Sequence, residues 1–199
     1  MTDEWLRSRE LSALTAGDAI KDNAAMIELI LGGARSGKSL LAEQRALESG
    51  LAVTCIATAE ARDDEMAQRI AHHQARRPAA WGLVEEPLQL AAALHTAAAG
   101  DRCLFVDCLT LWLSNLLFAD ADGRLLAQET AALLELLPTL PGRVILVSNE
   151  VGLGIIPLGE VTRRFVDEAG RLNQRVAAVA QRVTFVAAGL PLELKSPAA

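Results

Sequence analysis

The sequence has no surplus of basic residues. Its 199 residues include 19 Lys and Arg against 25 Asp and Glu, which gives a formal net charge of -6. A surface whose main task is to neutralise a phosphate backbone needs the opposite sign, so nucleic acid is excluded as the expected partner. The length favours one domain of ordinary size, and a hydrophobic content of 51% is ample for a buried core.

Cysteine is scarce, and no metal-binding spacing is present. The three cysteines, Cys55, Cys103 and Cys108, cannot all pair, and each lies in an apolar run where a thiol behaves as a small hydrophobic group. The sequence contains no Cys-x-x-Cys or His-x-x-x-His spacing, which argues against structural zinc. We therefore expect a reducing compartment and place the protein in the cytoplasm.

The sequence also lacks a secretory signal and a long apolar run. Its first residues include Asp3 and Glu4, where a signal peptide has a basic start followed by an apolar block. The most apolar stretch, 103–118, is interrupted by Asp107, Ser114 and Asn115, and it is too short and too polar to span a bilayer. We expect no membrane partner.

From Met26 onward, short apolar runs alternate with longer segments of helical period. Residues 1–25 lack this pattern, so we expect 1–25 to be a partly ordered extension and 26–199 to be the domain. The apolar runs predict strands at 27–31, 53–57, 103–107, 144–148 and 183–187. The segments between them predict helices at about 38–49, 63–76, 87–99, 109–118, 124–137 and 160–181. This alternation predicts an α/β fold with a mainly parallel sheet covered on both faces.

The first predicted strand leads directly into Gly32-Gly-Ala-Arg-Ser-Gly-Lys-Ser39, and a predicted helix follows. The pattern Gly-x-x-x-x-Gly-Lys-Ser/Thr in this setting is typical of a phosphate-binding loop. Its glycines let backbone N–H groups surround phosphate oxygens, and the helix N-terminus adds the positive end of its dipole. Lys38 is predicted to reach the β- and γ-phosphates, and the Ser39 hydroxyl to ligate Mg²⁺.

Polar residues follow several predicted strands. Thr58 follows the second strand, Asp107 ends the third, and Asn149 and Glu150 follow the fourth. In an open parallel sheet the ligand crevice lies beyond the carboxyl ends of the strands, so these residues should converge with the loop on one rim. Asp107 is placed like the acid that accompanies Mg²⁺ in phosphate-loop enzymes, but an Asp that caps the next helix would look the same. Both interpretations stay open.

Two adjacent histidines lie in the predicted helix 63–76, and at 3.6 residues per turn they face different ways. His73 is in phase with Met66 and Ile70, as expected of a packed histidine. His72 is in phase with a charged row, which consists of Glu65, Arg69, His72 and Arg76. A neutral imidazole among guanidinium groups suits attack on phosphorus, because nearby positive charge keeps the ring unprotonated. An exposed helix histidine without a catalytic role is the competing interpretation.

Five segments together resemble the bifunctional adenosylcobinamide kinase and adenosylcobinamide-phosphate guanylyltransferase family of cobalamin biosynthesis. These segments are Gly32 to Ser39, Ile56-Ala-Thr58, Asp63-Asp-Glu-Met66 running to Arg69-Ile-Ala-His-His73, Ser148-Asn-Glu-Val-Gly-Leu-Gly-Ile-Ile-Pro157 and Gly170-Arg-Leu-Asn-Gln-Arg175. The likeness covers about residues 26–195. Many families share the phosphate loop, whereas the segments around His72 and Asn149 are far more particular. The resemblance implies a three-layer, P-loop NTPase-like fold of the RecA type and a homotrimer.

The resemblance implies two successive reactions. ATP or GTP phosphorylates the hydroxyl of the aminopropanol arm of adenosylcobinamide. GTP then gives GMP to a histidine, His72 by family pattern, and this GMP passes to the new phosphate to form adenosylcobinamide-GDP. Catalytic roles fall on His72 and Lys38, with Mg²⁺ held by Ser39 and Asp107. The implied nucleotide contacts are Gly32, Gly33, Ala34, Arg35, Ser36, Gly37, Lys38, Ser39, Ala57, Thr58, Ala59, His73, Gln74, Ala75, Arg76, Glu85 and Asp107.

Two alternatives remain. A P-loop small-molecule kinase of another pathway would use the loop and leave His72 without a role. A nucleotide-operated switch would bind a partner protein without modifying a metabolite; its cues, a guanine loop of the Asn-Lys-x-Asp kind and a long mobile segment after the phosphate loop, are not evident in the sequence. Any preference for GTP must therefore come from other contacts.

Overall fold

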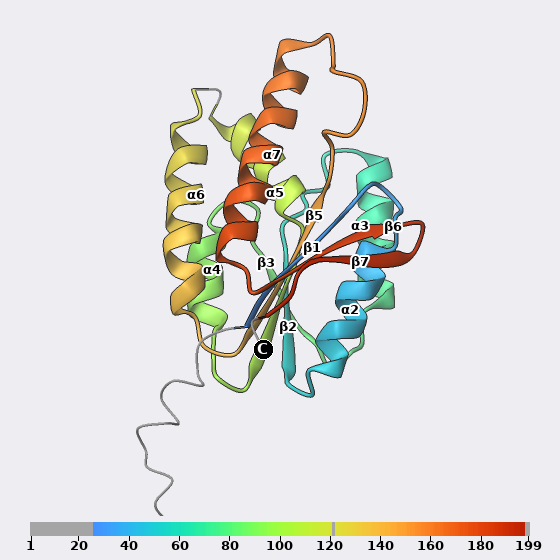
Figure 1. Ribbon diagram of the computed structural model, residues 1–199, viewed down its shortest axis with the longest axis vertical. Coiled ribbons are helices and arrows are strands. Elements are labelled where there is room, and N and C mark those ends of the chain that lie inside the picture. Colours follow the sequence, from blue (N-terminus) through green and yellow to red (C-terminus); the bar gives the residue numbers. More distant parts are fainter. Residues whose placement is uncertain (1–25, 121, 198–199) are drawn as a thin grey trace, which may run out of the picture.

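The computed structural model describes residues 26–120 and 122–197, apart from the side chains of Arg69, His72, His73 and Arg76. The extension predicted for 1–25 lies outside the described residues. One seven-stranded sheet has the order β3-β2-β4-β5-β1-β6-β7 (Figure 1). Its strands are β1 (Met26–Gly32), β2 (Ala52–Ala57), β3 (Gly82–Glu85), β4 (Arg102–Asp107), β5 (Arg143–Asn149), β6 (Arg182–Ala187) and β7 (Leu190–Lys195). The helices are α2 (Lys38–Glu48), α3 (Asp64–Arg76), α4 (Leu90–Ala97), α5 (Leu109–Ala119), α6 (Arg124–Leu136) and α7 (Glu160–Val179), with a short 3₁₀ turn η1 (Leu137–Thr139).

All five predicted strands are present, and the expectation of a mainly parallel sheet is confirmed. Strands β1 to β6 pair in parallel, and only β7 runs antiparallel to its neighbour. Strands β3 and β7 were not predicted. Both lie at the edges of the sheet and leave most of their side chains exposed, so neither carries the apolar run of a buried strand.

Four predicted helices match within one residue at each end, and two were predicted too long. The helix expected from 87 begins at Leu90, because the Glu86 carboxylate accepts hydrogen bonds from the N–H groups of Leu88 and Gln89 at 2.9 and 2.8 Å. The helix expected to reach 181 ends at Val179. Gln181 instead pairs with the start of β1, accepting from the Ile27 N–H at 2.7 Å and donating its own N–H to the Ile27 carbonyl at 2.9 Å.

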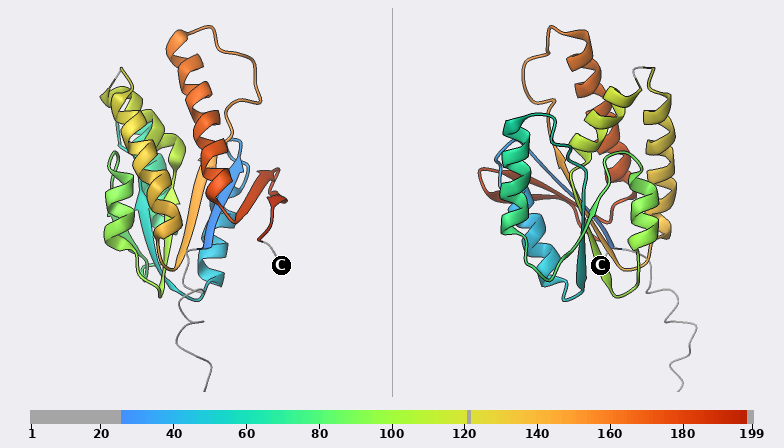
Figure 2. Two further views of the ribbon diagram at one scale, coloured as in Figure 1. Left: turned by 60° about the vertical axis from the view of Figure 1, so that its left-hand side comes forward. Right: turned by 180° about the vertical axis from the view of Figure 1, so that it is seen from behind.

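Helices cover both faces of the sheet, as predicted (Figures 1 and 2). Helices α4 to α7 pack on one face around the fully buried Trp112. On the other face, Ala42 and Ala46 of α2 pack against Phe105 and Ile145, and their small side chains let the helix approach the sheet closely. No helix among the described residues is long and apolar enough to cross a membrane.

A buried charge cluster joins β1 to its neighbours. Glu28 is completely buried, and its carboxylate forms ion pairs with Arg45 of α2 and with Arg143 of β5, the latter at 3.0 Å. Burial lowers the pKa of Arg45, because the interior solvates its charged form poorly. The pairs therefore hold charges that the interior would otherwise disfavour.

Replacing Glu28 by alanine should lower the free energy of unfolding by about 3–5 kcal/mol, because two guanidinium groups lose their buried partner. Urea denaturation monitored by circular dichroism measures the change. Glu193→Ala is the matched control, since it breaks the more exposed Arg182–Glu193 pair of 3.1 Å and should cost no more than about 1 kcal/mol. Equal losses in the two variants would contradict this account of the cluster.

Candidate functional site

The loop between β1 and α2 depends on two glycines. Gly37 has a φ of 98°, a left-handed conformation that side chains disfavour. A Cβ on Gly32 would lie 2.5 Å from both the Ser36 hydroxyl oxygen and the Val186 carbonyl oxygen. The spacing of these glycines in the sequence therefore has a steric cause, and the chain here folds into the strand–loop–helix unit that the motif predicts.

The turn between β6 and β7 packs against this loop. The N–H of Gly189 donates to the Ser36 carbonyl at 2.8 Å, and a Cβ on Gly37 would come within 3.3 Å of the Gly189 Cα. Strand β7, which was not predicted, forms a hairpin with β6. The turn of this hairpin holds the backbone of the phosphate loop in place.

The N-terminus of α2 is open to an anion. Gly37 occupies the N-cap position and no side chain caps the helix, so side chains leave its first N–H groups available to a ligand. The Lys38 side chain is buried, and its ammonium group donates to the Gly33 carbonyl at 3.0 Å. A buried cation and uncapped N–H groups face the same small region, which favours phosphate.

A cavity of about 270 Å³ lies beside the loop and brings together eight residues implied by the family resemblance. They are Ala34, Lys38, Ser39, Ala57, Ala59, Gln74, Glu85 and Asp107. The cavity also includes Asn149, which the sequence placed on the same rim. Its remaining lining residues, Met66, Ile70, Arg77, Cys108 and Leu111, were not predicted. The carboxyl ends of β1, β2, β4 and β5 therefore converge as the sheet topology requires.

Thr58, by contrast, lies behind the cavity wall. Its side chain is fully buried, and its hydroxyl accepts from the Cys108 N–H at 3.0 Å and donates to the Cys108 carbonyl at 2.8 Å. The Thr58 N–H donates to the Asp107 carbonyl at 3.3 Å. Thr58 thus fixes the backbone that carries Asp107 rather than lining the cavity.

Asp107 lies at the end of β4, next to the start of helix α5. Helix α5 begins at Leu109, and its N-cap residue is Cys108. Asp107 therefore lies one position before the residue that a helix-capping Asp would occupy. Asp107 instead lines the cavity together with Lys38 and Ser39.

Helix α3 forms the outer wall. Asp63 caps it by accepting from the Met66 N–H at 2.7 Å, and Asp64 and Glu65 occupy the first turn, where acids oppose the helix dipole favourably. The lining residues Met66, Ile70, Gln74 and Arg77 are spaced by four, four and three positions, so they share one face. The Gln74 amide donates to the Glu85 carboxylate at 3.3 Å, which links α3 to β3.

The histidine pair belongs to α3, but only its backbone is described. The side chains of His72, His73 and Arg76 lie outside the described residues, and so does the prediction that His72 belongs to a charged row. Met66 and Ile70, with which His73 is in phase, line the cavity. Ala75 is exposed and does not line it.

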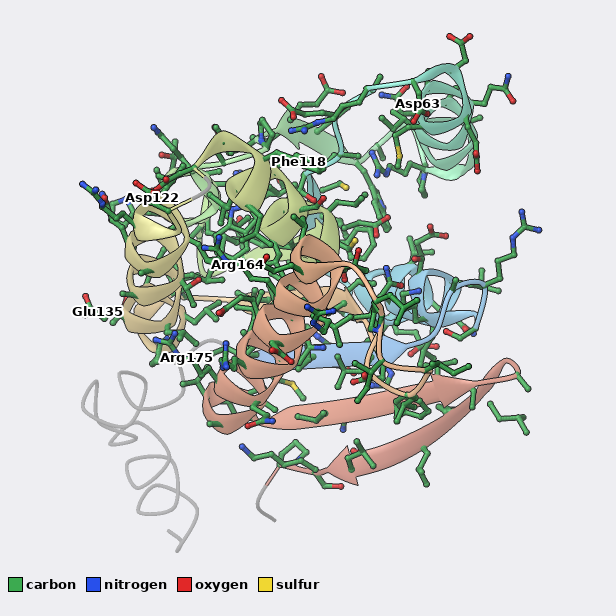
Figure 3. The ribbon with its side chains drawn as sticks, turned by 90° about the horizontal axis from the view of Figure 1, so that it is seen from above. Asp63, Phe118, Asp122, Glu135, Arg164 and Arg175 are labelled. Carbon is green, nitrogen blue, oxygen red and sulfur yellow. The ribbon has the colours of Figure 1, made fainter. Side chains whose placement is uncertain are left out.

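The start of α3 is tied to α5. Arg62 donates to the Asn115 amide oxygen at 3.3 Å, and its guanidinium carbon lies 4.7 Å from the centre of the Phe118 ring. Figure 3 shows Asp63 at the beginning of α3 and Phe118 on α5 along the same edge of the molecule. The buried Asn115 also donates to the Thr58 carbonyl at 2.7 Å. One side chain of α5 therefore contacts both ends of the loop that connects β2 to α3.

Cys108 is the only cysteine lining the cavity, and it is not a nucleophile there. Burial, with a smaller contribution from the Asp107 charge, raises the pKa of its thiol to about 11. The thiolate is the reactive form, so the thiol is inert near neutral pH. All three cysteines are buried and free.

A second, larger cavity of about 440 Å³ lies between α6 and α7 and shares no residue with the first. Figure 3 shows Arg164 and Arg175 of α7 on the side toward α6, where Asp122 also lies. Its charges are partly paired, since Arg171 contacts Glu168 at 2.7 Å. The N-terminus of α6, at Gly123, also borders this cavity, but the Asp120 carboxylate already accepts from the Leu125 N–H there at 2.9 Å. Volume alone therefore does not locate the functional site.

Solved structures support the fold. The flagellar accessory protein FlaH from Methanocaldococcus jannaschii is similar with a TM-score of 0.50 and 16% identity, over 92% of this chain and 86% of that one. Protein PH0250 from Pyrococcus horikoshii OT3 is similar with a TM-score of 0.53 and 10% identity, over 90% and 91%. With the parallel sheet and its two helical layers, these likenesses confirm the predicted P-loop NTPase-like fold of the RecA type.

Sequence comparisons are more specific. The family model for cobinamide kinase / cobinamide phosphate guanyltransferase matches residues 28–194. The bifunctional adenosylcobalamin biosynthesis protein CobP of Pseudomonas aeruginosa is 64% identical over 170 residues, which cover 85% of this chain and 98% of the relative. The corresponding protein CobU of Salmonella typhimurium is 39% identical over 182 residues, covering 85% and 100%. This chain belongs to the cobinamide kinase / cobinamide phosphate guanyltransferase family.

Proposed function

We propose that this protein phosphorylates adenosylcobinamide with ATP or GTP and then transfers GMP from GTP to the new phosphate through a guanylylated His72. One observation carries the proposal. In a chain of this family, the phosphate loop, Asp107 and the helix that bears the histidine pair border a single cavity.

The nucleotide phosphates bind at the loop 32–39. Their negative charge is met by the uncapped N-terminus of α2 and by Lys38, whose ammonium group exchanges the Gly33 carbonyl for phosphate oxygens. Arg77 adds a second cation at the other side of the cavity. Because these groups are held in place before the substrate arrives, they stabilise developing charge without reorganisation.

Mg²⁺ is the proposed cofactor, held by Ser39 and Asp107. The hydroxyl and the carboxylate line the same cavity and provide the oxygen ligands that Mg²⁺ prefers. Two protein ligands fit an ion that keeps its other positions for phosphate oxygens and water. When bound, Mg²⁺ supplies neutralisation of charge on the β- and γ-phosphates.

In the kinase step, the aminopropanol hydroxyl oxygen attacks the γ-phosphorus. A new O–P bond forms as the bond to the β–γ bridging oxygen breaks, and the nucleoside diphosphate leaves with the electron pair. The hydroxyl proton passes to an oxygen of the transferred group and then to water. The protein's contribution is positioning and charge stabilisation by Lys38 and the loop N–H groups.

In the guanylyl step, the imidazole of His72 attacks the α-phosphorus of GTP, and pyrophosphate leaves as a P–N bond forms. A phosphate oxygen of adenosylcobinamide phosphate then attacks the same phosphorus, and the P–N bond breaks to give adenosylcobinamide-GDP. Imidazole suits both halves because it is a good nucleophile and a good leaving group. The neutral Cys108 thiol offers no competing acceptor.

The remaining nucleotide contacts follow from the family resemblance. Glu85 and Gln74 are supported by their place in the cavity and by their mutual hydrogen bond, and Ala57 and Ala59 by their place in its wall. We extend the same role to His73, Ala75 and Arg76. Thr58 acts indirectly, through the backbone of Asp107 and Cys108.

We further propose a homotrimer in the cytoplasm. The segment after β5 exposes five apolar side chains, a surface that a second copy would cover: Leu153, Ile155, Ile156, Leu158 and Val161. The free cysteines are consistent with a reducing compartment. Light scattering should give three times the chain mass of 21.2 kDa, and a monomer would contradict the trimer.

The activity is tested with purified protein, adenosylcobinamide, Mg²⁺ and GTP. Chromatography with mass detection should show adenosylcobinamide phosphate first and adenosylcobinamide-GDP later. If only adenosylcobinamide phosphate forms, the protein is a kinase without guanylyltransferase activity. If the rate of GTP consumption does not depend on adenosylcobinamide, both proposed steps are contradicted.

A further inference from the structure

The larger cavity, between α6 and α7, is bordered by small side chains on one helix and by long, charged side chains on the other. Gly123, Ala127 and Thr130 are spaced by four and three positions, so they share the side of α6 that borders the cavity. Because these residues are small, they leave the volume of about 440 Å³ between the two helices.

The α7 side of this cavity is cationic. Arg164, Arg171 and Arg175 are seven and four positions apart, so they share one face of the helix. Figure 3 shows Arg164 and Arg175 on the side toward α6. A Cβ on Gly123 would collide with the Arg164 guanidinium group, so glycine at the start of α6 makes room for it.

The two acids that line the cavity leave Arg175 unpaired. Glu168 contacts Arg171 at 2.7 Å, and Asp122 contacts Arg124, which is not part of the lining, at 3.4 Å. Across residues 26–120 and 122–197, the Arg175 side chain forms no ion pair and no hydrogen bond. A guanidinium group beside a cavity and without a protein partner is available to an anion.

The floor of the cavity contains a hydroxyl without a partner. Thr130 is 4% exposed, and its hydroxyl forms no hydrogen bond within the described part of the chain. A hydroxyl that is almost fully enclosed needs a hydrogen-bond partner, and a polar atom of a ligand can provide it. The buried Leu126 and Leu172 also line the cavity and offer an apolar surface to a carbon skeleton.

The motif Gly170–Arg175 lies along this cavity. Its lining members are Arg171, Leu172, Gln174 and Arg175. Asn173 of the same motif instead donates to the Asn149 carbonyl of β5 at 3.2 Å. Neither proposed reaction uses the four lining residues, so a second ligand gives them a function.

We propose that the cavity between α6 and α7 binds an organic phosphate, at a site separate from the nucleotide cavity. Arg171 and Arg175 are about 6 Å apart along the helix axis, and a phosphate monoester carries about 1.5 to 2 negative charges at pH 7. Its oxygens match the forked donors of both guanidinium groups, whereas a carboxylate has one charge for the two. The Thr130 hydroxyl donates to a ligand oxygen, and the carbon skeleton packs on Leu126 and Leu172.

The test is a ³¹P NMR titration with phenyl phosphate, a phosphate monoester with an apolar body. Arg175→Gln should raise its dissociation constant about tenfold, as expected for a lost hydrogen bond between charged groups. Arg124→Gln is the matched control, because it removes an exposed cation outside the lining, and its constant should stay within about twofold of the wild-type value. A folded Arg175→Gln protein with the wild-type constant overturns the proposal, and so does a wild-type protein that does not bind phenyl phosphate.

Two variants of Thr130 provide a second readout. Thr130→Val removes the hydroxyl with little change in volume and should raise the constant about threefold, whereas Thr130→Ser should keep it near the wild-type value. Equal constants for the two variants would contradict the hydrogen bond to the ligand. Thermal melting of each variant identifies any loss of affinity that comes from unfolding.

The phosphate loop is the competing site for the probe. Lys38→Met removes the loop cation, and the folded variant should still bind phenyl phosphate in the cavity between α6 and α7. If Lys38→Met abolishes binding and Arg175→Gln does not change it, the probe lies at the loop and the proposal is overturned.

Two further probes separate the parts of the ligand. Inorganic phosphate lacks the apolar body and should bind about fivefold more weakly than phenyl phosphate. Phenylacetate has a similar body with one negative charge and should bind about tenfold more weakly, measured by the change in its proton signals. Equal affinity for inorganic phosphate would contradict an organic ligand, and equal affinity for phenylacetate would contradict a phosphate.

Discussion

Replacing Lys38 by alanine is expected to lower the rate of adenosylcobinamide phosphorylation by about three orders of magnitude. Lys38 is buried at 8% exposed, so its charge acts on phosphate in a region with little water to screen it. The ammonium group already lies at the loop, 3.0 Å from the Gly33 carbonyl oxygen. Single-turnover transfer of the labelled γ-phosphate of GTP to the corrinoid measures the rate of the chemical step.

Two controls accompany this variant. Lys38→Met keeps most of the apolar stem, so a stable Lys38→Met protein with the same loss of activity assigns the effect to the charge. Lys195→Ala removes a cation from the end of the chain, where it bonds the Ala177 and Ala178 carbonyls at 3.0 and 3.2 Å, and should leave the rate unchanged. Near-normal turnover of a folded Lys38→Ala protein would mean that the loop does not bind the transferring phosphate.

Replacing His72 by alanine is expected to abolish guanylyl transfer and to leave phosphorylation within a few-fold of wild type. The imidazole forms the P–N bond in the second reaction only, whereas the first depends on the loop. After incubation with α-labelled GTP, the wild-type protein should retain label that is stable to base and labile to acid. The His72→Ala protein should retain none.

His73→Ala is the comparison variant, because it removes the neighbouring imidazole from the same helix. It should still become labelled, more slowly because a proposed nucleotide contact is lost, since the family pattern assigns the bond to His72. Label that persists on His72→Ala but disappears from His73→Ala would identify His73 as the nucleophile. Label absent from the wild-type protein would remove the guanylylated intermediate altogether.

The fold could be predicted from the sequence wherever burial shapes the residue pattern. Strands such as β4 and β5 are covered on both faces, so they appear as apolar runs, and the loop before Lys38 appears as a local glycine spacing. Strand β7 has no such run, because all six of its residues are exposed and its position depends on pairing with β6. Glu86 shortens α4 through side-chain hydrogen bonds that hydrophobic periodicity does not register.

For the candidate site too, local sequence patterns could be predicted and tertiary contacts could not. Residues fixed by local spacing, such as Lys38 and Ser39, were found from the motif, and Asn149 from its place after a strand. Arg77 and Leu111 were not, because only the folded sheet brings α3 and α5 to the loop. The spacing of Met66, Ile70, Gln74 and Arg77 was the available signal, yet it indicates a buried helix face as readily as a ligand wall. Thr58 follows its strand as predicted, but it does not line the cavity, because hydrogen bonds hold its hydroxyl on the Cys108 backbone.

The triphosphate is expected to lie against the loop 32–39, in the cavity of about 270 Å³, and not in the larger cavity between α6 and α7. A crystal structure of the protein with α,β-methylene-GTP and Mg²⁺ tests this most directly. We expect phosphate oxygens within hydrogen-bond distance of the loop N–H groups, with Lys38 released from the Gly33 carbonyl. A nucleotide held by Arg164 and Arg175, with the loop unchanged, would contradict the account.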